Sequence, residues 1–320
     1  MSRNAPVFRV GVDIGGTSVK CGVLDEGNNF VARGSIRTNP EHPFEDVVER
    51  IGGLIKETLT GAGVSASGGQ CAGVGMGSPG IVDSRSGVVV FAGNLNWSLV
   101  PLAGELAKHI DLPIKAANDA DCAALGESLA GAAAGCRNVI LVTLGTGVGG
   151  GVVLDGKIFS GGLPGGGELG HMLLVREGLA CTCGRKGCYE AYANAGALER
   201  AAVSALSAYP DSLMGHRAAA EFDCEWIFDC AREGDFAAKG VIYNYINCVG
   251  DGLVDLTNIF RPEKIIIGGG VGQAGASLTD PLNEYVMNNC FAGKRSFYPQ
   301  VVPAVLGNDA GIIGAANLGH

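Results

Sequence analysis

The stretch VGVDIGGTSVKCGVLD at residues 10–25 and the stretch LVTLGTGVGGGVVLD at residues 141–155 decide the fold of this chain. Each stretch holds an apolar, β-branched run, a short turn of glycine and threonine, and a second apolar run. This order predicts a β-hairpin in each stretch, with glycine-rich backbone at its tip. Because the two stretches lie about 130 residues apart, we interpret them as an internal duplication that gives two α/β lobes.

Composition is consistent with a soluble, two-lobed protein. The chain has 320 residues, of which 47% are hydrophobic, and this length exceeds the size at which a single core usually stops growing. A formal net charge of −9 opposes binding of a polyanion, so we expect no nucleic-acid partner. The longest uncharged apolar stretch, residues 139–154, is rich in glycine and shorter than the roughly 18 residues of a spanning helix, so we expect no membrane partner. An odd count of 11 cysteines without a signal peptide predicts a cytoplasmic protein.

The glycine-threonine turns predict a nucleotide site. Glycine lets the main chain approach phosphate oxygens, threonine hydroxyls donate to them, and Asp13 offers a carboxylate to the water around Mg²⁺, which together suit ATP. A third apolar run at residues 264–268 also ends in glycines, where an adenine or ribose could approach the backbone. No P-loop ending and no G-x-G-x-x-G helix start is present, which disfavours P-loop and Rossmann enzymes. The alternative for each cluster is a simple turn. The expected nucleotide ligands are Asp13, Gly15, Gly16, Thr17, Gly145, Thr146, Gly147, Gly268, Gly269 and Gly270.

The pattern H-x9-C-x-C-G-x2-G-C-x-E predicts a metal site. Its one imidazole and three thiols, from His171, Cys181, Cys183 and Cys188, make a complete tetrahedral set for structural Zn²⁺, with no open position for a catalytic water. The alternative is that these cysteines are ordinary buried thiols. Glu168 precedes the histidine by three residues and Glu190 follows the last cysteine by two. A metal that orders this loop would therefore also fix two carboxylates beside it.

The candidate catalytic group lies between the two hairpins. Residues 112–117 are expected to form a strand and residues 120–130 a helix, with Asn118 and Asp119 between them. One of the two could simply cap the helix, but the carboxyl end of a strand in an α/β lobe is also where a ligand crevice is expected. A sugar hydroxyl that accepts a phosphoryl group needs a carboxylate to take its proton, and Asp119 is the candidate base. The residues expected to contact the sugar are Ser78, Asn94, Asn118, Asp119, Glu168, His171 and Glu190.

These motifs resemble the ROK family of bacterial sugar kinases and regulators, and within it the glucokinases. The resemblance covers nearly the whole chain. It rests on DIGGT at residues 13–17, GSPG at 77–80, NLNW at 94–97, NDADCAALGE at 118–127, LGTGVGGG at 144–151, GELGH at 167–171, CTCGRKGCYE at 181–190 and IIIGGG at 265–270.

The resemblance implies an actin-like, ribonuclease-H-like fold of two α/β domains with a cleft between them. A small domain would comprise residues 1–117 and a returning helix at about 305–320, and a large domain would comprise residues 118–304 with the zinc loop. The implied activity is ATP-dependent phosphorylation of glucose to glucose 6-phosphate, with Asp119 as base, Mg²⁺ on the nucleotide and His171 both on zinc and beside the sugar. Family members commonly form homodimers or homotetramers.

Three alternatives remain open from the sequence. The acceptor could be N-acetylmannosamine, N-acetylglucosamine, fructose or mannose, since the glycines at residues 165–167 would leave space for an N-acetyl group. Polyphosphate could replace ATP as donor. The chain could also be a sugar-sensing regulator, but regulators of this family carry a helix-turn-helix region before the first strand, and only residues 1–6 precede it here. Residues 201–223 hold no strong motif.

Overall fold

The structure is a computed structural model that describes residues 7–65, 69–218 and 222–319. The chain divides into two compact units: the first holds Met1–Arg137, Gly151–Gly167 and Val305–His320, and the second holds Asn138–Gly150 and Glu168–Ala304. The expected domains, 1–117 with about 305–320 and 118–304, stay a prediction, because compactness alone does not define a domain. The expectation about residues 1–6 concerns a segment outside the described residues, and so does part of the unassigned segment 201–223.

The first sheet has the strand order β3-β2-β1-β4-β8. β1 pairs antiparallel with β2, and β2 with β3, whereas β4 lies parallel to β1 and β8 lies parallel to β4. A hairpin meander is therefore extended by two parallel strands. The bounds are β1 (Phe8–Ile14), β2 (Ser18–Leu24), β3 (Phe30–Arg37), β4 (Cys71–Ser78) and β8 (Ile114–Asn118).

The second sheet repeats this order as β11-β10-β9-β12-β13. β12 lies parallel to both β9 and β13, and β11 pairs antiparallel with β10. Equivalent strands thus take equivalent places in the two sheets, which confirms the α/β fold with an internal duplication. The bounds are β9 (Val139–Leu144), β10 (Val148–Leu154), β11 (Lys157–Ile158), β12 (Lys264–Gly268) and β13 (Gln300–Pro303).

A small third sheet in the first unit consists of β5 (Ile81–Asp83), β6 (Val88–Ala92) and β7 (Trp97–Val100). The short 3₁₀ helix η1 (Gly93–Leu95) connects β6 to β7 and holds the start of the NLNW motif. The Trp97 ring is buried and makes an edge contact with Phe44 at 5.1 Å between ring centroids. This packing ties the motif to the core.

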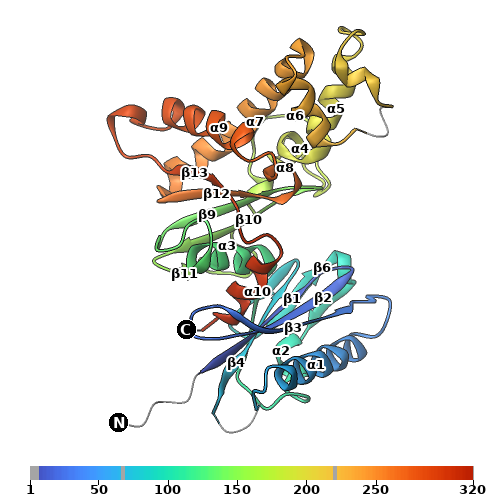
Figure 1. Ribbon diagram of the computed structural model, residues 1–320, viewed down its shortest axis with the longest axis vertical. Helices are drawn as coiled ribbons and strands as arrows, with labels where there is room; N and C mark the ends of the chain where they lie inside the picture. The colour runs from blue at the N-terminus through green and yellow to red at the C-terminus, as the bar shows by residue number, and fades with distance from the viewer. Residues whose placement is uncertain (1–6, 66–68, 219–221, 320) are drawn as a thin grey trace. The chain divides into compact units, whose positions relative to one another are not determined.

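The side chains of β1 alternate between the two faces of the sheet, and those on one face belong to the core of the first unit. Val10, Val12 and Ile14 are fully buried in one cluster with apolar residues of α1 (Phe44–Gly61) and α2 (Leu102–Leu106), whereas Gly11 is on the opposite face. There the backbone of α10 (Asp309–Ala316) lies so close that a Cβ on Gly11 would overlap the Ile312 carbonyl oxygen. Figure 1 shows α1 beside this sheet and the C-terminal α10 in red. The absence of a side chain at Gly11 therefore lets the last helix lie directly on the strand.

The two helices expected from the sequence are present in the first unit, with shifted ends. The expected strand 112–117 runs from Ile114 to Asn118, the helix expected at 120–130 starts at Asp119, and the returning helix expected at about 305–320 spans Asp309–Ala316. The remaining helices are α3 (Asp119–Ala130), α4 (Glu190–Ala193), α5 (Ala195–Ala205), α6 (Cys224–Arg232), α7 (Phe236–Phe260), α8 (Gly269–Gly272) and α9 (Ala276–Asn289), with short 3₁₀ turns η2 (Leu169–His171), η3 (Leu213–His216) and η5 (Gly293–Arg295).

Within the described ranges, no helix combines the length and the apolar character that crossing a bilayer would demand.

Candidate active site and metal centre

The carboxyl ends of three parallel strands bring the predicted polar residues of the first unit together. Asp13 of β1 is in register with Gly77 of β4, and Ser78 of β4 is in register with Asn118 of β8. Asp119 follows directly as the first residue of α3. Parallel strands end at the same edge of a sheet, so this row lies where a ligand crevice is expected in an α/β unit.

Asn118 caps α3. The sequence left open whether Asn118 or Asp119 would have this role. Its side-chain oxygen accepts hydrogen bonds from the N–H groups of Ala120 at 2.8 Å and Asp121 at 3.1 Å. Its side-chain nitrogen donates to the Gly80 carbonyl at 2.9 Å, which ties the start of α3 to the GSPG loop. Asn118 thus fixes the position of the carboxylate beside it.

Asp13 and Asp119 form an electrostatically coupled pair. Burial raises the pKa of Asp119 above that of an ordinary carboxyl, although the Ala120 N–H, which donates to it at 2.8 Å, acts in the opposite direction. Burial and then the charge of Asp119 raise the pKa of Asp13 to about 6, against the opposing effect of Lys20. Two poorly solvated carboxylates at a strand edge are suited to accept a proton and to attract a cation.

The first glycine turn lies next to Asn94. The Gly15 N–H donates to the Ser18 carbonyl at 2.9 Å and closes the tip of the β1/β2 hairpin. A Cβ built on Gly16 would lie 3.7 Å from the Asn94 side-chain nitrogen, so this amide is in van der Waals range of the turn. Thr17 is exposed at the tip. The loops from residues 15–17 and 93–95 therefore meet on one side of the first unit.

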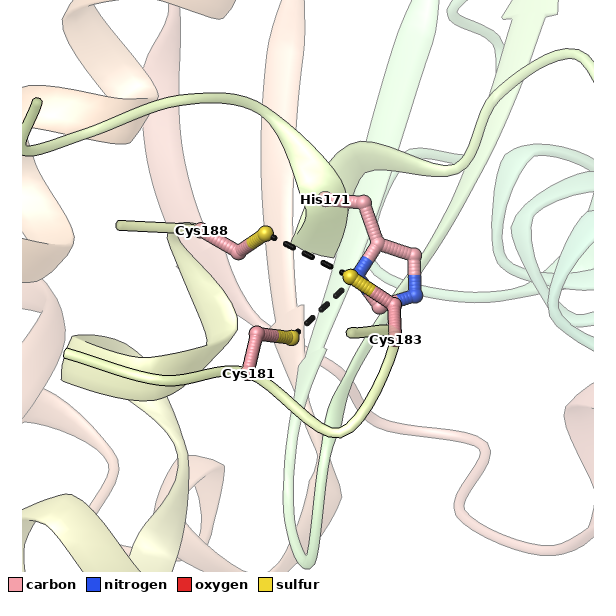
Figure 2. A group of neighbouring side chains, drawn as sticks. All are labelled: His171, Cys181, Cys183 and Cys188. Carbon is pink, nitrogen blue, oxygen red and sulfur yellow. Dashed lines mark hydrogen bonds between the residues drawn. The ribbon is translucent and has the colours of Figure 1, made fainter. Parts of the chain in front are cut away.

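Figure 2 shows the four predicted metal ligands with their donor atoms directed toward one another. All four donor atoms lie within 4.8 Å of one another. The His171 Nδ1 atom is 3.7 Å from the Cys181 sulfur, and the Cys183 and Cys188 sulfurs are 3.6 Å apart. A zinc tetrahedron with sulfur bonds of about 2.3 Å has edges of nearly 3.8 Å. These two separations match the edges of such a tetrahedron, so the donor set and its spacing are suited to a zinc ion.

The thiols of this cluster have different environments. Burial and the neighbouring thiols raise the pKa of Cys188 to about 11, whereas a hydrogen bond from the backbone of Arg185 lowers the pKa of the exposed Cys183. Isolated bridges between Leu173 and Cys188 and between residues 180 and 186 hold the loop in a narrow hairpin. The backbone alone thus places the sulfurs close together, and a bound cation would offset the cost of ionising them.

The two carboxylates that flank the metal motif differ in their contacts. Glu168 is exposed, and its carbonyl accepts from the His171 N–H at 3.1 Å. Glu190 begins α4, and its two carboxylate oxygens accept from the Thr182 hydroxyl and from the Val148 N–H, each at 3.1 Å. Glu190 therefore connects the metal loop to the turn at residues 145–147. That turn is closed by the Gly145 N–H on the Gly147 carbonyl at 3.0 Å, with Thr146 exposed.

The third glycine cluster opens a helix next to a cavity. Gly268 ends β12, and Gly269 and Gly270 begin the single turn of α8. A cavity of about 420 Å³ lies beside Gly270 and is lined on its other side by α6. The α6 residues on this cavity are Cys224, Glu225, Phe228 and Arg232.

Sequence reasoning missed the α6 contribution to this cavity. These residues lie some forty positions before the glycines, and nothing in their spacing resembles a ligand motif. The available signal was the amphipathic pattern of residues 224–232, in which Ile227, Phe228 and Cys230 are buried and Phe228 also lines the cavity.

The predicted site residues thus fall into two groups, one in each unit. The structure brings Asp13, Ser78, Asn118 and Asp119 to one sheet edge, and it brings the metal cluster, Glu190 and the second glycine turn together. The first unit holds Asp13, Gly15, Gly16, Thr17, Ser78, Asn94, Asn118 and Asp119, and the second holds Gly145, Thr146, Gly147, Glu168, His171, Cys181, Cys183, Cys188, Glu190, Gly268, Gly269 and Gly270.

The profile of the ROK family matches residues 9–320 of the chain. A glucokinase from Thermotoga maritima is 36% identical over 312 residues, which cover 97% of this chain and 96% of that protein. The crystal structure of a ROK family glucokinase from Streptomyces griseus, in complex with glucose and AMPPNP, is 35% identical with a TM-score of 0.75 and covers 97% of this chain and 98% of that one. The ROK hexokinase from Thermus thermophilus is 32% identical with a TM-score of 0.78, covering 97% of each chain.

Proposed function

Since the chain belongs to the ROK family and is an ATP-dependent sugar kinase of the hexokinase type, with the actin-like fold of that family, we propose that it phosphorylates glucose on the 6-hydroxyl. The acceptor is supported by the glucokinases to which the chain is similar along nearly its whole length. The observation on which the chemistry depends is the buried carboxylate of Asp119 at the carboxyl edge of the first sheet.

Asp119 is the proposed general base. The sugar hydroxyl becomes more acidic as its oxygen bonds to the γ-phosphorus, and a carboxylate within hydrogen-bond reach then takes the proton. Burial makes the Asp119 carboxylate more basic than an ordinary one, which favours that transfer. Asn118 holds the backbone on which Asp119 is carried, because both of its amide atoms are bonded within the first unit. Its proposed contact with the sugar must therefore share these atoms.

The nucleotide is proposed to bind through the three glycine clusters. The turns at residues 15–17 and 145–147 would hold phosphates, and Asp13 would bind water of a Mg²⁺ ion, which neutralises charge as the phosphoryl group moves. The adenosine would enter the cavity between Gly270 and α6, whose volume of about 420 Å³ suits a ring system of that size.

Six polar side chains are proposed to contact the sugar. They are Ser78, Asn94, Asn118, Glu168, His171 and Glu190. The proposed sugar contact of Ser78 has the least structural support, because its hydroxyl is buried and donates to the Pro79 carbonyl at 3.3 Å.

Zinc is proposed to order the loop that carries these second-unit groups. Its donor set would be His171, Cys181, Cys183 and Cys188, a closed set that leaves no position for a reacting water. The residues around the metal then act by holding Glu168 and Glu190 in place.

We also propose that the protein acts in the cytoplasm as a homodimer or homotetramer, without nucleic acid. The acidic net charge of −9 supports the absence of a nucleic-acid partner, because it would repel a polyanion. The assembly follows the family pattern and is measured by light scattering of the purified chain.

The test is an ADP-release assay with Mg-ATP and a panel of glucose, mannose, fructose, N-acetylglucosamine and N-acetylmannosamine. We expect the highest kcat/KM with glucose. Turnover restricted to an N-acetylhexosamine would overturn the substrate while leaving the kinase class intact. A parallel assay with polyphosphate in place of ATP checks the phosphoryl donor.

A further inference from the structure

A short segment directly after the metal loop contacts the second glycine turn at three points. The segment is residues 190–195, the junction of α4 and α5, and it begins two residues after Cys188. Besides the bond from the Val148 N–H to Glu190, the Ala195 N–H donates to the Gly145 carbonyl at 2.8 Å. The Asn194 side-chain nitrogen donates to the Thr146 carbonyl at 3.2 Å. Consecutive peptide groups of the turn are thus held from one side.

Asn194 divides its amide between two tasks. Its oxygen accepts from the Ala197 N–H at 2.7 Å and caps α5. Its nitrogen is the donor to Thr146. Capping needs only the oxygen, so serine, aspartate or asparagine would serve at this position. Only the amide also supplies a donor in the same geometry, which makes the second task separable from the first by mutation.

Close approach of Glu190 depends on Gly147. A Cβ built there would lie 2.6 Å from the Glu190 carboxylate oxygen, too close for an unstrained contact. A glycine turn fits against the segment, but glycine also gives the free turn more backbone freedom than any other residue. The contacts from residues 190–195 offset that freedom by fixing the turn in one conformation.

Because peptide groups are planar, these contacts also fix the directions of the N–H groups in the turn. In a trans peptide the carbonyl and the following N–H point in opposite directions. Holding the Gly145 and Thr146 carbonyls toward the segment therefore directs the N–H groups of Thr146 and Gly147 to the other side of the turn. Backbone N–H groups aligned in this way form an anion-binding concavity.

We propose that Asn194 is a positioning residue for the nucleotide, which presents the peptide N–H groups of the turn at residues 145–147 to the phosphates before ATP binds. This rests on the proposed function, in which that turn holds phosphate. Asn194 touches neither phosphate nor sugar, so it acts through the Thr146 peptide. Fixing the turn in advance lowers the conformational entropy lost when the nucleotide binds. The affinity for the nucleotide therefore increases, whereas the affinity for the sugar does not.

The test is the substitution Asn194→Asp, which keeps the capping oxygen and the size of the side chain but replaces the donor with an acceptor facing the Thr146 carbonyl. Calorimetric titration with Mg-AMPPNP measures nucleotide affinity without turnover. We expect the Kd for Mg-AMPPNP to rise about tenfold, as for loss of one hydrogen bond with some added repulsion, and the Kd for glucose to change less than twofold.

Asn283→Asp is the matched control. Asn283 of α9 likewise donates through its nitrogen to a backbone carbonyl, that of Val301, at 2.7 Å, while its oxygen accepts from a backbone N–H. Its backbone partner is in β13 rather than in a glycine turn. We expect its Mg-AMPPNP affinity to equal that of the wild-type protein, even if its melting temperature falls.

Asn194→Ser provides a second variant that caps α5 without adding charge, and it serves if the aspartate variant does not fold. Wild-type nucleotide affinity in both variants would overturn the proposal, and so would equal losses for nucleotide and glucose, which indicate a general structural role. The proposed function can fail separately. If the wild-type chain binds Mg-AMPPNP but does not phosphorylate glucose, the glucose assignment is wrong, whereas the ratio of Kd values still decides the role of Asn194.

Discussion

At the scale of single residues, the helix cap and the candidate base are neighbours with separate tasks. Asn118 bonds to two N–H groups of α3 and to the GSPG loop, whereas the Asp119 carboxylate accepts the N–H of Ala120. The sequence predicted that an asparagine and an aspartate stand at the end of a strand, and it left open which of them caps. Spacing could not decide this, because both residues are good caps.

Asp119→Ala is expected to lower kcat by about 10²–10⁴-fold, the usual contribution of a positioned general base, with little change in the Kd for glucose. Steady-state kinetics and calorimetry of the same preparation measure the two quantities. Asp111→Asn, which changes an exposed carboxylate of the same unit, is the control and should retain wild-type kcat. A kcat near wild type in Asp119→Ala would remove Asp119 from the role of base.

Asp13 is expected to make stability depend on pH in the absence of Mg²⁺ and nucleotide. Its pKa is raised from 3.8 to about 6, so the folded protein holds more protons than the unfolded chain between these values. Its contribution to stability is therefore complete below about pH 4 and is lost as pH rises through 6. Asn cannot ionise, so Asp13→Asn should gain about 1–3 kcal/mol relative to the wild-type protein between pH 4 and pH 7.5. Urea unfolding at both pH values measures this; a constant difference would contradict it.

At the scale of elements, the metal loop and the α3/α10 crossing show two ways in which the chain fixes a short segment. The loop uses side chains, which the spacing of His171 and the cysteines predicted correctly as a cluster. The crossing uses missing side chains. A Cβ on Gly314 would overlap the carbonyl oxygen of Cys122, so the helices touch through backbone. Single-sequence reading did not detect this crossing, since 53 glycines conceal the few that are required for packing.

The cysteine cluster predicts one zinc per chain, measured by inductively coupled plasma mass spectrometry. Cys183→Ser should reduce the zinc content to well below one equivalent, and hydrogen exchange should rise in residues 171–190. Because residues 190–195 follow the cluster, chelation should also weaken Mg-AMPPNP binding. Cys136→Ser, a partly exposed cysteine outside the cluster, should keep a full equivalent. Full zinc in Cys183→Ser would show that the cluster is not the ligand set.

Gly314→Ala is expected to destabilise the protein by about 1–3 kcal/mol, because the methyl group has no space between α10 and α3. Gly240→Ala is the matched control at an exposed position of α7, where no atom lies within 4 Å of the added Cβ. That substitution should stabilise the protein by up to about 1 kcal/mol through helix propensity. Urea midpoints of the two variants test the contrast, and equal midpoints would argue against tight packing at Gly314.

At the scale of the whole molecule, sequence reasoning found the duplication because each hairpin has its own glycine turn. It also found the strands β1 and β12, since buried runs of β-branched residues are a strong signal. It missed the cavity wall from α6, because that wall is formed by residues far from the glycines in sequence. Contacts between distant segments leave no local period, and only a three-dimensional arrangement reveals them.

The fold of the first unit depends on residues 305–320. We expect a protein that stops at residue 304 to lose the folded first unit. The last segment supplies α10, and the buried Glu127 carboxylate accepts the N–H groups of Val305 at 2.9 Å and Leu306 at 2.8 Å. Removal would expose the glycine face of β1 and leave that carboxylate without these donors. Circular dichroism and size-exclusion chromatography of the truncated protein measure the loss. A folded monomer with wild-type helix content would contradict this dependence.

Because α10 lies on β1, β1 leaves the ribosome long before the helix that covers it is made. At common translation rates the delay is on the order of ten seconds or more, during which one face of the nascent sheet has no covering segment. Chaperones that hold unfinished chains would meet this face in every copy synthesised. Codon choice near the end of the message could therefore affect the yield of active protein as much as any residue at the site of chemistry.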